Sequence, residues 1–575
     1  AISTALDDIS ETISVRLHPE VNHYFGDSPN GLAVSQDGNA LYVTNGMDNA
    51  IAVINPGKMA STQGVNDKSS VEGYIPTGAY PSSVSISTDG KLYVTNLEGR
   101  GAQLPVPAPS SEGVAFNAHH MLASVSIIDI PDEKQLERYT NTVIAVNQMK
   151  RLTETQLPAR TDILPKPVPE RIGEPSAFKH VVYIIKENRT YDQVLGDIPG
   201  GNGDTALCIY GRKVTPNTHQ LASDFVLMDN YMAAGKCSAE GHQWTDASIV
   251  TDYIEKNVRA WFRSYPHVQT DALVYAPTGF LWDNAVKHGK KVKIYGEAAT
   301  PVFDEALTWK DIYTGFLDGD NFAFHNKTTI DPVRPLLSKT YPGYDHHKIP
   351  DVLRADAFVK DWEKYEQMEG DSIPDLMVVA LPNDHTAGTR PGFPTPRAMV
   401  ADNDLALGMI IEAITDSRFW QNTVVFVTED DSQDGWDHLS AYRTVGLVIS
   451  PYSRLNKPVH TAYNQPSMVR TIEQILGLPP MNIQDAIAAP MTACFDSTAN
   501  LQSWQHSFNQ IPLDEMNPKL ESLNGKAKQY AKQSMQPQFN HIDSGNDDML
   551  NRILWFSAKG HTPYPKTYAG DDEEK

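Results

Sequence analysis

Cysteine is scarce in this sequence of 575 residues, which holds only Cys208, Cys237 and Cys494. Their spacing fits no zinc-binding motif and allows one disulfide at most, so a zinc finger and a disulfide-stapled scaffold are excluded. Long apolar runs are also missing: none approaches the ~18 residues that span a bilayer, and we expect no transmembrane segment. The opening residues AISTALDDIS lack the basic and apolar regions of a signal peptide. We therefore expect either a cytoplasmic chain or a mature one whose leader has been removed.

Basic residues are outnumbered, since 48 Lys and Arg residues face 71 Asp and Glu residues and the formal net charge is −23. Such a surface repels phosphate backbones, which excludes nucleic-acid binding as the main role, although a local basic pocket can still hold an anion. A chain of this length exceeds what one hydrophobic core serves and favours two or more domains. The 39 prolines and 37 glycines are typical of a loop-rich architecture rather than a helical bundle.

An internal repeat lies near the N-terminus. Residues 28–56 read SPNGLAVSQDGNALYVTNGMDNAIAVINP, and residues 80–100 echo them with YPSSVSISTDGKLYVTNLEGR. Each copy contains an Asp-Gly pair, which ends at Gly38 in the first copy and at Gly90 in the second. These pairs predict hairpin turns, because glycine adopts the positive φ that such turns need.

The repeat resembles the YVTN family of β-propeller repeats, whose blades have four strands. Residues 123–131 (ASVSIIDIP) predict a further strand of the second copy, after an insertion over roughly residues 100–120, and residues 141–149 (NTVIAVNQM) look like a fragment of a third copy. A closed propeller typically has about 4–8 blades, and open edge strands invite aggregation. The resemblance therefore implies that a longer precursor or a partner chain completes the ring.

A proline-rich stretch separates these repeats from the rest of the chain. Pro165, Pro167 and Pro169 favour extended backbone, which indicates a linker. We therefore expect propeller blades at 1–150, a linker at 151–174, a catalytic domain at 175–500 and a C-terminal extension, packed on the catalytic domain, at 501–575.

Beyond the linker, short apolar strands alternate with helical stretches, which favours a mostly parallel sheet covered on both faces. The expected strands are KHVVYIIKE, DFVLMDNY, KVKIYGE, PDLMVVALP, NTVVFVTED and TVGLVISPY. The expected helices include GHQWTDASIVTDYIEK, TGFLWDNAVKHG, MVADNDLALGMIIEAIT and PSMVRTIEQILG. The predicted fold class is α/β, an α/β/α sandwich preceded by all-β propeller blades, and ligands of such sheets bind beyond the carboxyl ends of the strands.

Three of the expected strands end in possible metal ligands. These are Glu187 and Asn188, then Asn383, Asp384 and His385, and finally Glu429, Asp430, Asp431, Asp434, Asp437 and His438. Carboxylates at the ends of adjacent parallel strands repel one another unless a cation lies between them. Oxygen and imidazole ligands suit a divalent ion such as Zn²⁺, Mn²⁺, Mg²⁺ or Ca²⁺. The pattern therefore predicts a metal or anion site at this edge of the sheet.

Ser238, in GKCSAEGHQW, is the candidate nucleophile. It stands just before a helical pattern, where free N–H groups and the helix dipole favour an anion. A phosphoryl oxygen can rest on those amides while the hydroxyl attacks, and a metal lowers the pKa of such a hydroxyl. The neighbouring Cys237 has no evident basic partner. His242, one helical turn after Ser238, can line the same pocket.

Taken together, these motifs resemble the phosphoesterase family of bacterial phospholipases C and acid phosphatases, within the alkaline phosphatase superfamily. The resemblance covers the region of about 170–495 and rests on FKHVVYIIKENRTYDQVLGD, SAEGHQW, LPNDHTAGT and TEDDSQDGWDH. It implies an α/β/α sandwich of the alkaline-phosphatase type. It also implies that Ser238 is the nucleophile and that Glu187 and Asn188 hold the metal and the phosphoryl group. His385 would be a metal ligand or the general acid for the leaving group.

The same resemblance implies that Asp430 and Asp431 are metal ligands and that His438 completes the site. Related phospholipase-like proteins commonly have Asp-Glu where this chain has Asp430 and Asp431, and the shorter side chain leaves the preferred cation open. The number of ions also stays open, because the superfamily includes members with one metal and members with two. We place His242 in the substrate pocket. Arg443 can contact a phosphoryl oxygen or form a structural ion pair, and the sequence does not separate the two.

Each candidate also has an ordinary structural explanation. Glu187 and Asn188 can form a turn, and Ser238 can merely cap a helix. The remaining alternatives are a buried, hydrogen-bonded His385, a solvated acidic turn at Asp430 and Asp431, and a pair between His438 and Asp437. Arg189 and Asp192 are expected to brace the first loop rather than to touch substrate.

We therefore predict a metal-dependent phosphoesterase that hydrolyses small phosphate esters through Ser238 and a phosphoseryl intermediate. One alternative is a phospholipase C-like phosphodiesterase, although the surface charge disfavours anionic membranes. The other is a propeller-based scaffold with an inactive esterase domain, but a buried charged cluster costs stability without its ion. The habit of the family implies a periplasmic or secreted protein.

Overall fold

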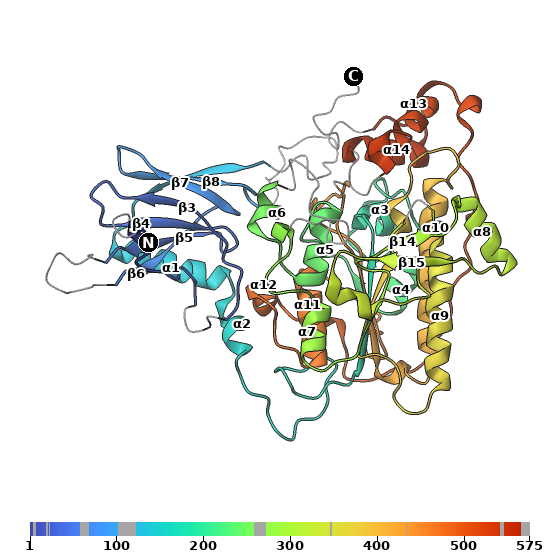
Figure 1. Cartoon of the computed structure of the whole chain (residues 1–575), viewed down its shortest axis with the longest axis horizontal. Coiled ribbons are helices and arrows are strands. Elements are labelled where there is room, and N and C mark those ends of the chain that lie inside the picture. Colours follow the sequence, from blue (N-terminus) through green and yellow to red (C-terminus); the bar gives the residue numbers. More distant parts are fainter. Residues whose placement is uncertain are drawn as a thin grey trace.

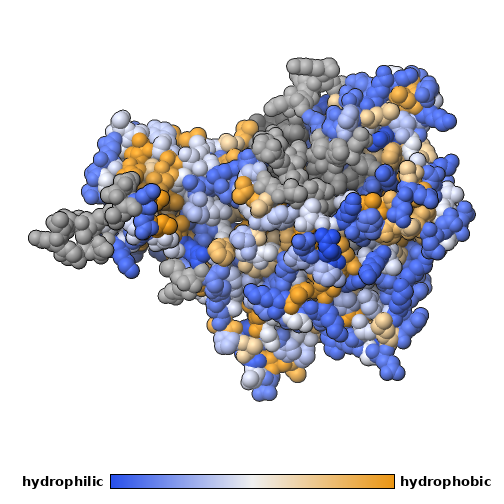
Figure 2. Space-filling view, viewed as in Figure 1, coloured by the Kyte–Doolittle hydropathy of each residue, from blue (hydrophilic) through white to orange (hydrophobic). Residues whose placement is uncertain are grey.

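The computed structural model describes residues 1–3, 7–18, 21, 23–57, 68–101, 122–257, 272–345, 348–433, 435–540 and 546–564. Antiparallel sheets from the N-terminal residues, blue in Figure 1, lie beside a larger part in which helices cover a central sheet. The face seen in Figure 2 is largely hydrophilic, with hydrophobic residues grouped over the N-terminal sheets. In the described ranges, every helix is too short or too polar to span a lipid bilayer. The insertion predicted at roughly 100–120 lies almost wholly outside these ranges.

Both repeat copies fold as antiparallel sheets. The first has the order β3 (Pro29–Val34), β4 (Leu41–Asn45), β5 (Ala50–Asn55) and β6 (Ser70–Pro76). The second has the order β7 (Pro81–Ile86), β8 (Lys91–Asn96) and β9 (Ser124–Asp129). Gly38 and Gly90 turn the two hairpins with φ of 72° and 79°, the positive values that the Asp-Gly pairs predict. The predicted strand at 123–131 is confirmed, because β9 pairs with β8 as β5 pairs with β4.

The two sheets pack face to face. In the first sheet, Ile51 and Val53 of β5 are buried against the second sheet. The residues at the same strand positions in the second sheet are Val125 and Ile127, which are 58% and 60% exposed. The apolar face of the second sheet is thus exposed, whereas the corresponding face of the first sheet is packed against the second sheet. Completion of a propeller by further blades on that face stays a prediction.

Residues 141–149, predicted as a fragment of a third blade, are not a strand. They belong to α1 (Glu133–Val146) and the start of α2 (Met149–Glu154). A short apolar run such as VIAV suits a strand or a helix equally. The run forms a helix here for two reasons. Asp132 caps the helix by accepting from the amide of Gln135 at 2.7 Å, and Val143 packs against the face of the first sheet that lies opposite the second sheet.

A five-stranded sheet forms the centre of the larger part. Its order is β13 (Val292–Tyr295), β16 (Leu376–Leu381), β10 (His180–Lys186), β17 (Thr423–Glu429) and β18 (Gly446–Ile449), all parallel except β18. One face packs against α5 (Ser238–Ala247), α7 (Leu281–Lys287) and α11 (Gln465–Leu476). The other face packs against α4 (Pro216–Asp224), α9 (Asp351–Gln367) and α10 (Pro396–Asp416). The α/β class is therefore confirmed, with helices on both sides of the sheet.

Two predicted elements are interrupted. DFVLMDNY forms only the two-residue strands β11 (Leu227–Met228) and β12 (Tyr231–Met232), which pair with β19 (Pro458–Val459) and β20 (Tyr463–Asn464) outside the central sheet. GHQWTDASIVTDYIEK divides into α5 and α6 (Asp252–Asn257), because Ser248 adopts a left-handed φ of 55° and ends α5.

The C-terminal residues fold back over the loops of the larger part, as the upper right of Figure 1 shows. They form α13 (Gly525–Ser534) and α14 (Asp547–Lys559). Trp555 of α14 packs edge-on against Trp436 at 5.3 Å, and Asn551 donates to the carbonyl oxygen of Gln433 at 3.3 Å. Other helices of the larger part are α3 (Tyr191–Leu195), α8 (Trp309–Asp318) and α12 (Ile483–Ile487).

Candidate functional site

The candidate site begins where two neighbouring parallel strands end. Lys186, the last residue of β10, pairs in register with Glu429, the last residue of β17. Glu187 and Asn188 follow the first strand and Asp430 follows the second, so the structure brings their side chains together. The backbone amide of Asn188 donates to Oδ1 of Asp430 at 3.2 Å. Asn188 has a left-handed φ of 72°, a conformation that asparagine tolerates better than most residues and that recurs at functional sites.

Ser238 is the first residue of α5 and is fully buried. Its Oγ lies 2.8 Å from Oδ1 of Asn188 and 3.0 Å from Oδ2 of Asp431. A backbone bridge between Gly235 and Asp431 holds the loop before the helix beside this carboxylate. The start of a helix also presents N–H groups that have no partner within the helix. The hydroxyl therefore has a proton acceptor on one side and an anion-binding helix end on the other.

His242 lies one turn further along α5 and faces the same cluster. Its Nε2 is 3.3 Å from Oδ2 of Asp430 and 3.5 Å from Oε1 of Glu187, and its Nδ1 is 3.0 Å from Oε1 of Glu297. Burial lowers the pKa of His242, but the surrounding carboxylates outweigh burial and raise it well above its ordinary value. The structure thus places His242 among the carboxylates at the strand ends.

Glu297 belongs to this cluster although the sequence reasoning above did not single it out. It is buried and follows β13, an edge strand of the same parallel sheet, after a single glycine. The signal was available in KVKIYGE, whose carboxylate stands just past an apolar strand as Glu187 and Asp430 do. Its oxygen accepts from His242, which orients the ring.

Two other carboxylates from the predicted clusters share one lysine. Nζ of Lys186 lies 2.9 Å from Oδ2 of Asp384 and 2.8 Å from Oε1 of Glu429. All three side chains are buried, and Oδ1 of Asp384 also accepts the amide of Glu187 at 2.9 Å. This triad lies at the strand ends directly before Glu187 and Asp430. Lys186 pairs with Asp384 and Glu429 and does not pair with Glu187 or Asp430.

His385 contacts the side chain of Gln433, whose backbone amide donates to Oδ1 of Asp431. Nδ1 of His385 lies 3.0 Å from the carbonyl oxygen of Thr386, and Nε2 lies 3.1 Å from the amide nitrogen of Gln433. Nδ1 is therefore the protonated nitrogen. Burial lowers the pKa of His385 to about 4, so the ring is neutral at neutral pH. The arrangement suits a metal ligand better than a general acid, and its role stays a prediction.

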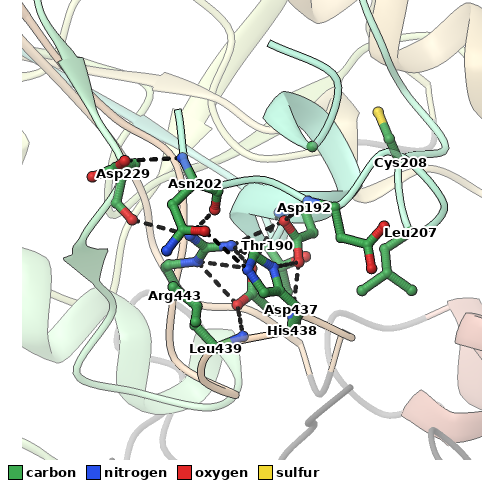
Figure 3. A network of polar contacts seen from close by, with 12 residues as sticks. Thr190, Asp192, Asn202, Leu207, Cys208, Asp229, Asp437, His438, Leu439 and Arg443 are labelled. Atoms are coloured by element: carbon green, nitrogen blue, oxygen red, sulfur yellow. Dashed lines mark hydrogen bonds and ion pairs between the residues drawn. The ribbon is translucent and has the colours of Figure 1, made fainter. Parts of the chain in front are cut away.

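His438 and Arg443 lie in a separate network, which Figure 3 shows. Nη2 of Arg443 is 2.9 Å from Oδ1 of Asp192 and 2.9 Å from Oδ2 of Asp437, and Nδ1 of His438 is 2.7 Å from Oδ2 of Asp192. The guanidinium already supplies the positive charge between these carboxylates. The structure therefore does not bring His438 and Arg443 together with Ser238, and their roles as metal ligand and substrate contact stay predictions. Asp434 lies outside the described residues.

The donor set around Ser238 fits a divalent cation. Buried ligand atoms of Glu187, His242 and Asp430 all lie within 4.8 Å of one another. The side-chain oxygen of Asn188 lies 2.9 Å from Oδ1 of Asp430 and 2.7 Å from Oδ2 of Asp431, so three oxygen acceptors face each other. Such a contact is repulsive unless the amide turns over or a cation sits among the oxygens.

Comparison with protein families gives one match. Residues 202–479 match the model of the Phosphoesterase family, a range that contains Ser238, His385 and Asp430, while Glu187 and Asn188 precede it. No curated protein matches the chain. The family match identifies the chain as a hydrolase that acts on phosphoester bonds.

Solved structures that match the chain include a protein of the alkaline phosphatase superfamily from Vibrio parahaemolyticus, at 13% identity and a TM-score of 0.35, over 60% of this chain and 78% of that one. The lipoteichoic acid synthase LtaP from Listeria monocytogenes has 12% identity and a TM-score of 0.35, over 72% of this chain and 97% of that one. The phosphonate monoester hydrolase of Agrobacterium radiobacter has 14% identity and a TM-score of 0.34, over 56% of this chain and 78% of that one. At this level of similarity they carry no information on the activity of this chain.

Proposed function

We propose that the protein hydrolyses phosphate monoesters in a metal-dependent reaction, with Ser238 as the nucleophile and a phosphoseryl intermediate. The observation that carries this proposal is the buried Ser238 hydroxyl at the start of α5, within hydrogen-bond distance of both Asn188 and Asp431. A serine that only capped its helix would not need two buried polar partners from the loops that follow β10 and β17.

In the first step, Oγ of Ser238 attacks phosphorus, the Oγ–P bond forms and the bond from phosphorus to the leaving alcohol breaks. Asp431 accepts the serine proton, since its Oδ2 lies 3.0 Å from Oγ. The departing alkoxide takes up a proton from solvent, and Asp431 releases the serine proton to solvent. In the second step, water attacks phosphorus, the Oγ–P bond breaks, and the proton that the water loses passes to Oγ of Ser238. The products are the alcohol and inorganic phosphate. The amides at the start of α5 support the charge on the phosphoryl oxygens during both steps.

Glu187, Asn188, Asp430 and Asp431 are the residues that we propose hold the divalent ion, identified only as Zn²⁺, Mn²⁺, Mg²⁺ or Ca²⁺. When bound, the ion stabilises negative charge on the phosphoryl group and lowers the pKa of a nearby hydroxyl. Asn188 sits between the two aspartates and Ser238, so it orients the hydroxyl toward the substrate. Gln433 holds His385 in one tautomer beside this group.

The test is the hydrolysis of p-nitrophenyl phosphate by Ser238→Ala. We expect a loss of roughly 10³-fold or more in kcat, because removal of a nucleophile disables the chemical step. Cys237→Ala is the matched control, since it removes a reactive atom from the adjacent residue, and it should keep the rate. Near wild-type rates in Ser238→Ala would overturn the assignment of the nucleophile.

Two further readouts separate the alternatives named above. A phosphoseryl intermediate predicts covalent labelling of the wild-type chain, but not of Ser238→Ala, after acid quench with radiolabelled substrate. Faster hydrolysis of bis(p-nitrophenyl) phosphate than of the monoester would instead favour a phosphodiesterase. No turnover of either ester with any of the four cations would favour a scaffold role.

A further inference from the structure

Asp246 occupies an unusual position on the helix that carries Ser238. Residues 238, 242 and 246 are spaced by four and share one face of α5. Asp246 is only 1% exposed, and neither of its carboxylate oxygens has a hydrogen-bond partner among the described residues. Asp404, which is buried to the same extent, shows what such a carboxylate normally requires: it accepts two bonds from Asn217 and two from Thr218.

The group that Asp246 faces is a second buried acid. Ligand atoms of Asp246, Glu297 and His242 lie within 4.8 Å of one another. Oε1 of Glu297 accepts from Nδ1 of His242, while Oε2 is buried and has no hydrogen-bond partner in the described part of the chain. Three buried carboxylate oxygens of this pair therefore have no donor among the described residues. Glu297 contacts Nδ1 of the His242 ring, whereas Asp430 lies near Nε2.

Two buried carboxylates in contact need either a shared proton or a cation. The imidazole of His242 cannot neutralise both, because Glu187 and Asp430 already lie on its other side. We propose that Asp246, Glu297 and Nδ1 of His242 form a second divalent-cation site, distinct from the ion held by Glu187, Asn188, Asp430 and Asp431. Two carboxylates with one imidazole suit Zn²⁺ or Mn²⁺. An ion there fixes the His242 ring, with its Nε2–H directed at the Tyr344 hydroxyl, 3.0 Å away, and at Oδ2 of Asp430, 3.3 Å away.

The test counts bound metal and does not depend on turnover. Chelator-treated full-length protein is dialysed to equilibrium against Zn²⁺, and separately against Mn²⁺, and the metal per chain is measured by mass spectrometry. We expect two tight ions in the wild-type protein and in Ser238→Ala. Asp246→Asn keeps the side-chain volume and should lose one of them, and Glu297→Gln should do the same. Asp430→Asn should also lose one ion, and the double variant Asp246→Asn with Asp430→Asn should lose both.

Thermal melting gives an independent readout, because a bound ion stabilises the folded state by mass action. Added metal should raise the Tm of Asp430→Asn but not that of the double variant. If the wild-type protein binds one ion, which Asp430→Asn loses and Asp246→Asn keeps, the acid pair shares a proton and the second site is refuted while the proposed function stands. If the folded wild-type protein binds no ion, both proposals are wrong.

Discussion

Gly241 approaches the backbone of Asp430 so closely that no side chain fits between α5 and the end of β17. A Cβ atom on Gly241 would lie 2.7 Å from the carbonyl oxygen of Asp430 and 2.9 Å from its carbonyl carbon. Backbone atoms cannot rotate away, so a methyl group must push apart the helix that carries Ser238 and the strand end that carries Asp430. The glycine in SAEGHQW therefore sets the spacing of the site.

Gly241→Ala should consequently impair catalysis. We expect roughly a hundredfold loss in kcat/KM, since a misplacement of about 1 Å can cost that much. Gly315→Ala, on α8, is the matched control: a Cβ there would lie 2.7 Å from Cζ of Phe322, which is the far end of a movable side chain in the segment after the helix. Steady-state hydrolysis of p-nitrophenyl phosphate measures both variants. Full activity in Gly241→Ala would show that the site tolerates a wider gap.

Lys186→Met should destabilise the larger part strongly. Removing the lysine leaves the buried carboxylates of Asp384 and Glu429 uncompensated, which costs about 3–5 kcal/mol. Lys179→Met removes an exposed lysine that lies 3.3 Å from Asp371, and it should cost about 0–1 kcal/mol. Urea unfolding followed by tryptophan fluorescence measures this part alone, because all nine tryptophans lie beyond residue 240. Equal costs for the two variants would contradict the triad.

The stabilisation that Asp197 gives the folded protein should be lost at acid pH. Burial raises the pKa of Asp197, but the hydrogen bond and charge of His219, with Nε2 at 2.8 Å, outweigh burial and lower the pKa to about 2. The unfolded chain therefore takes up this proton first as the pH falls. The stabilisation is present above about pH 4 and is lost as the pH falls toward 2.

Asp197→Asn tests this dependence by guanidinium unfolding at several pH values. The variant should be less stable than the wild-type protein at pH 7, and the difference should shrink below about pH 4. Asp331→Asn is the control, because Asp331 is exposed and its contact with Arg334 is a surface pair. A difference that stays constant from pH 7 to pH 2.5 would exclude the Asp197 carboxylate as its source.

Ile51 and Val125 stand at the same strand position in the two repeat copies, but they should contribute differently to the stability of the folded protein. Ile51→Ala removes a fully buried side chain between the two N-terminal sheets and should cost about 2–5 kcal/mol. Val125→Ala, at the same strand position of the second copy, should stay within about 0.5 kcal/mol because the side chain is exposed. Hydrogen exchange of the β5 and β9 amides reports both effects. A large cost at Val125 would mean that the outer face is covered in solution.

Much of the site could be read from local patterns. An apolar run that gives way to a carboxylate marks a strand end, and Glu187 and Asp430 both follow such runs. Because the strands are parallel, their ends meet at one edge, and the convergence follows from the pattern alone. Ser238 and His242 are similarly local, since a spacing of four places both on one face of a helix.

Partners of charged groups are decided by the tertiary fold. Nothing local tells whether Arg443 faces a substrate or the carboxylates of Asp192 and Asp437, because a long flexible side chain can reach several acids and only the folded chain selects among them. The VIAV run became part of α1 for a related reason: its periodicity is ambiguous, and the first sheet offered a face that a helix could cover. Local patterns indicated where the strands before Glu187 and Asp430 end, whereas electrostatic pairing and burial depend on segments that lie far apart in the sequence.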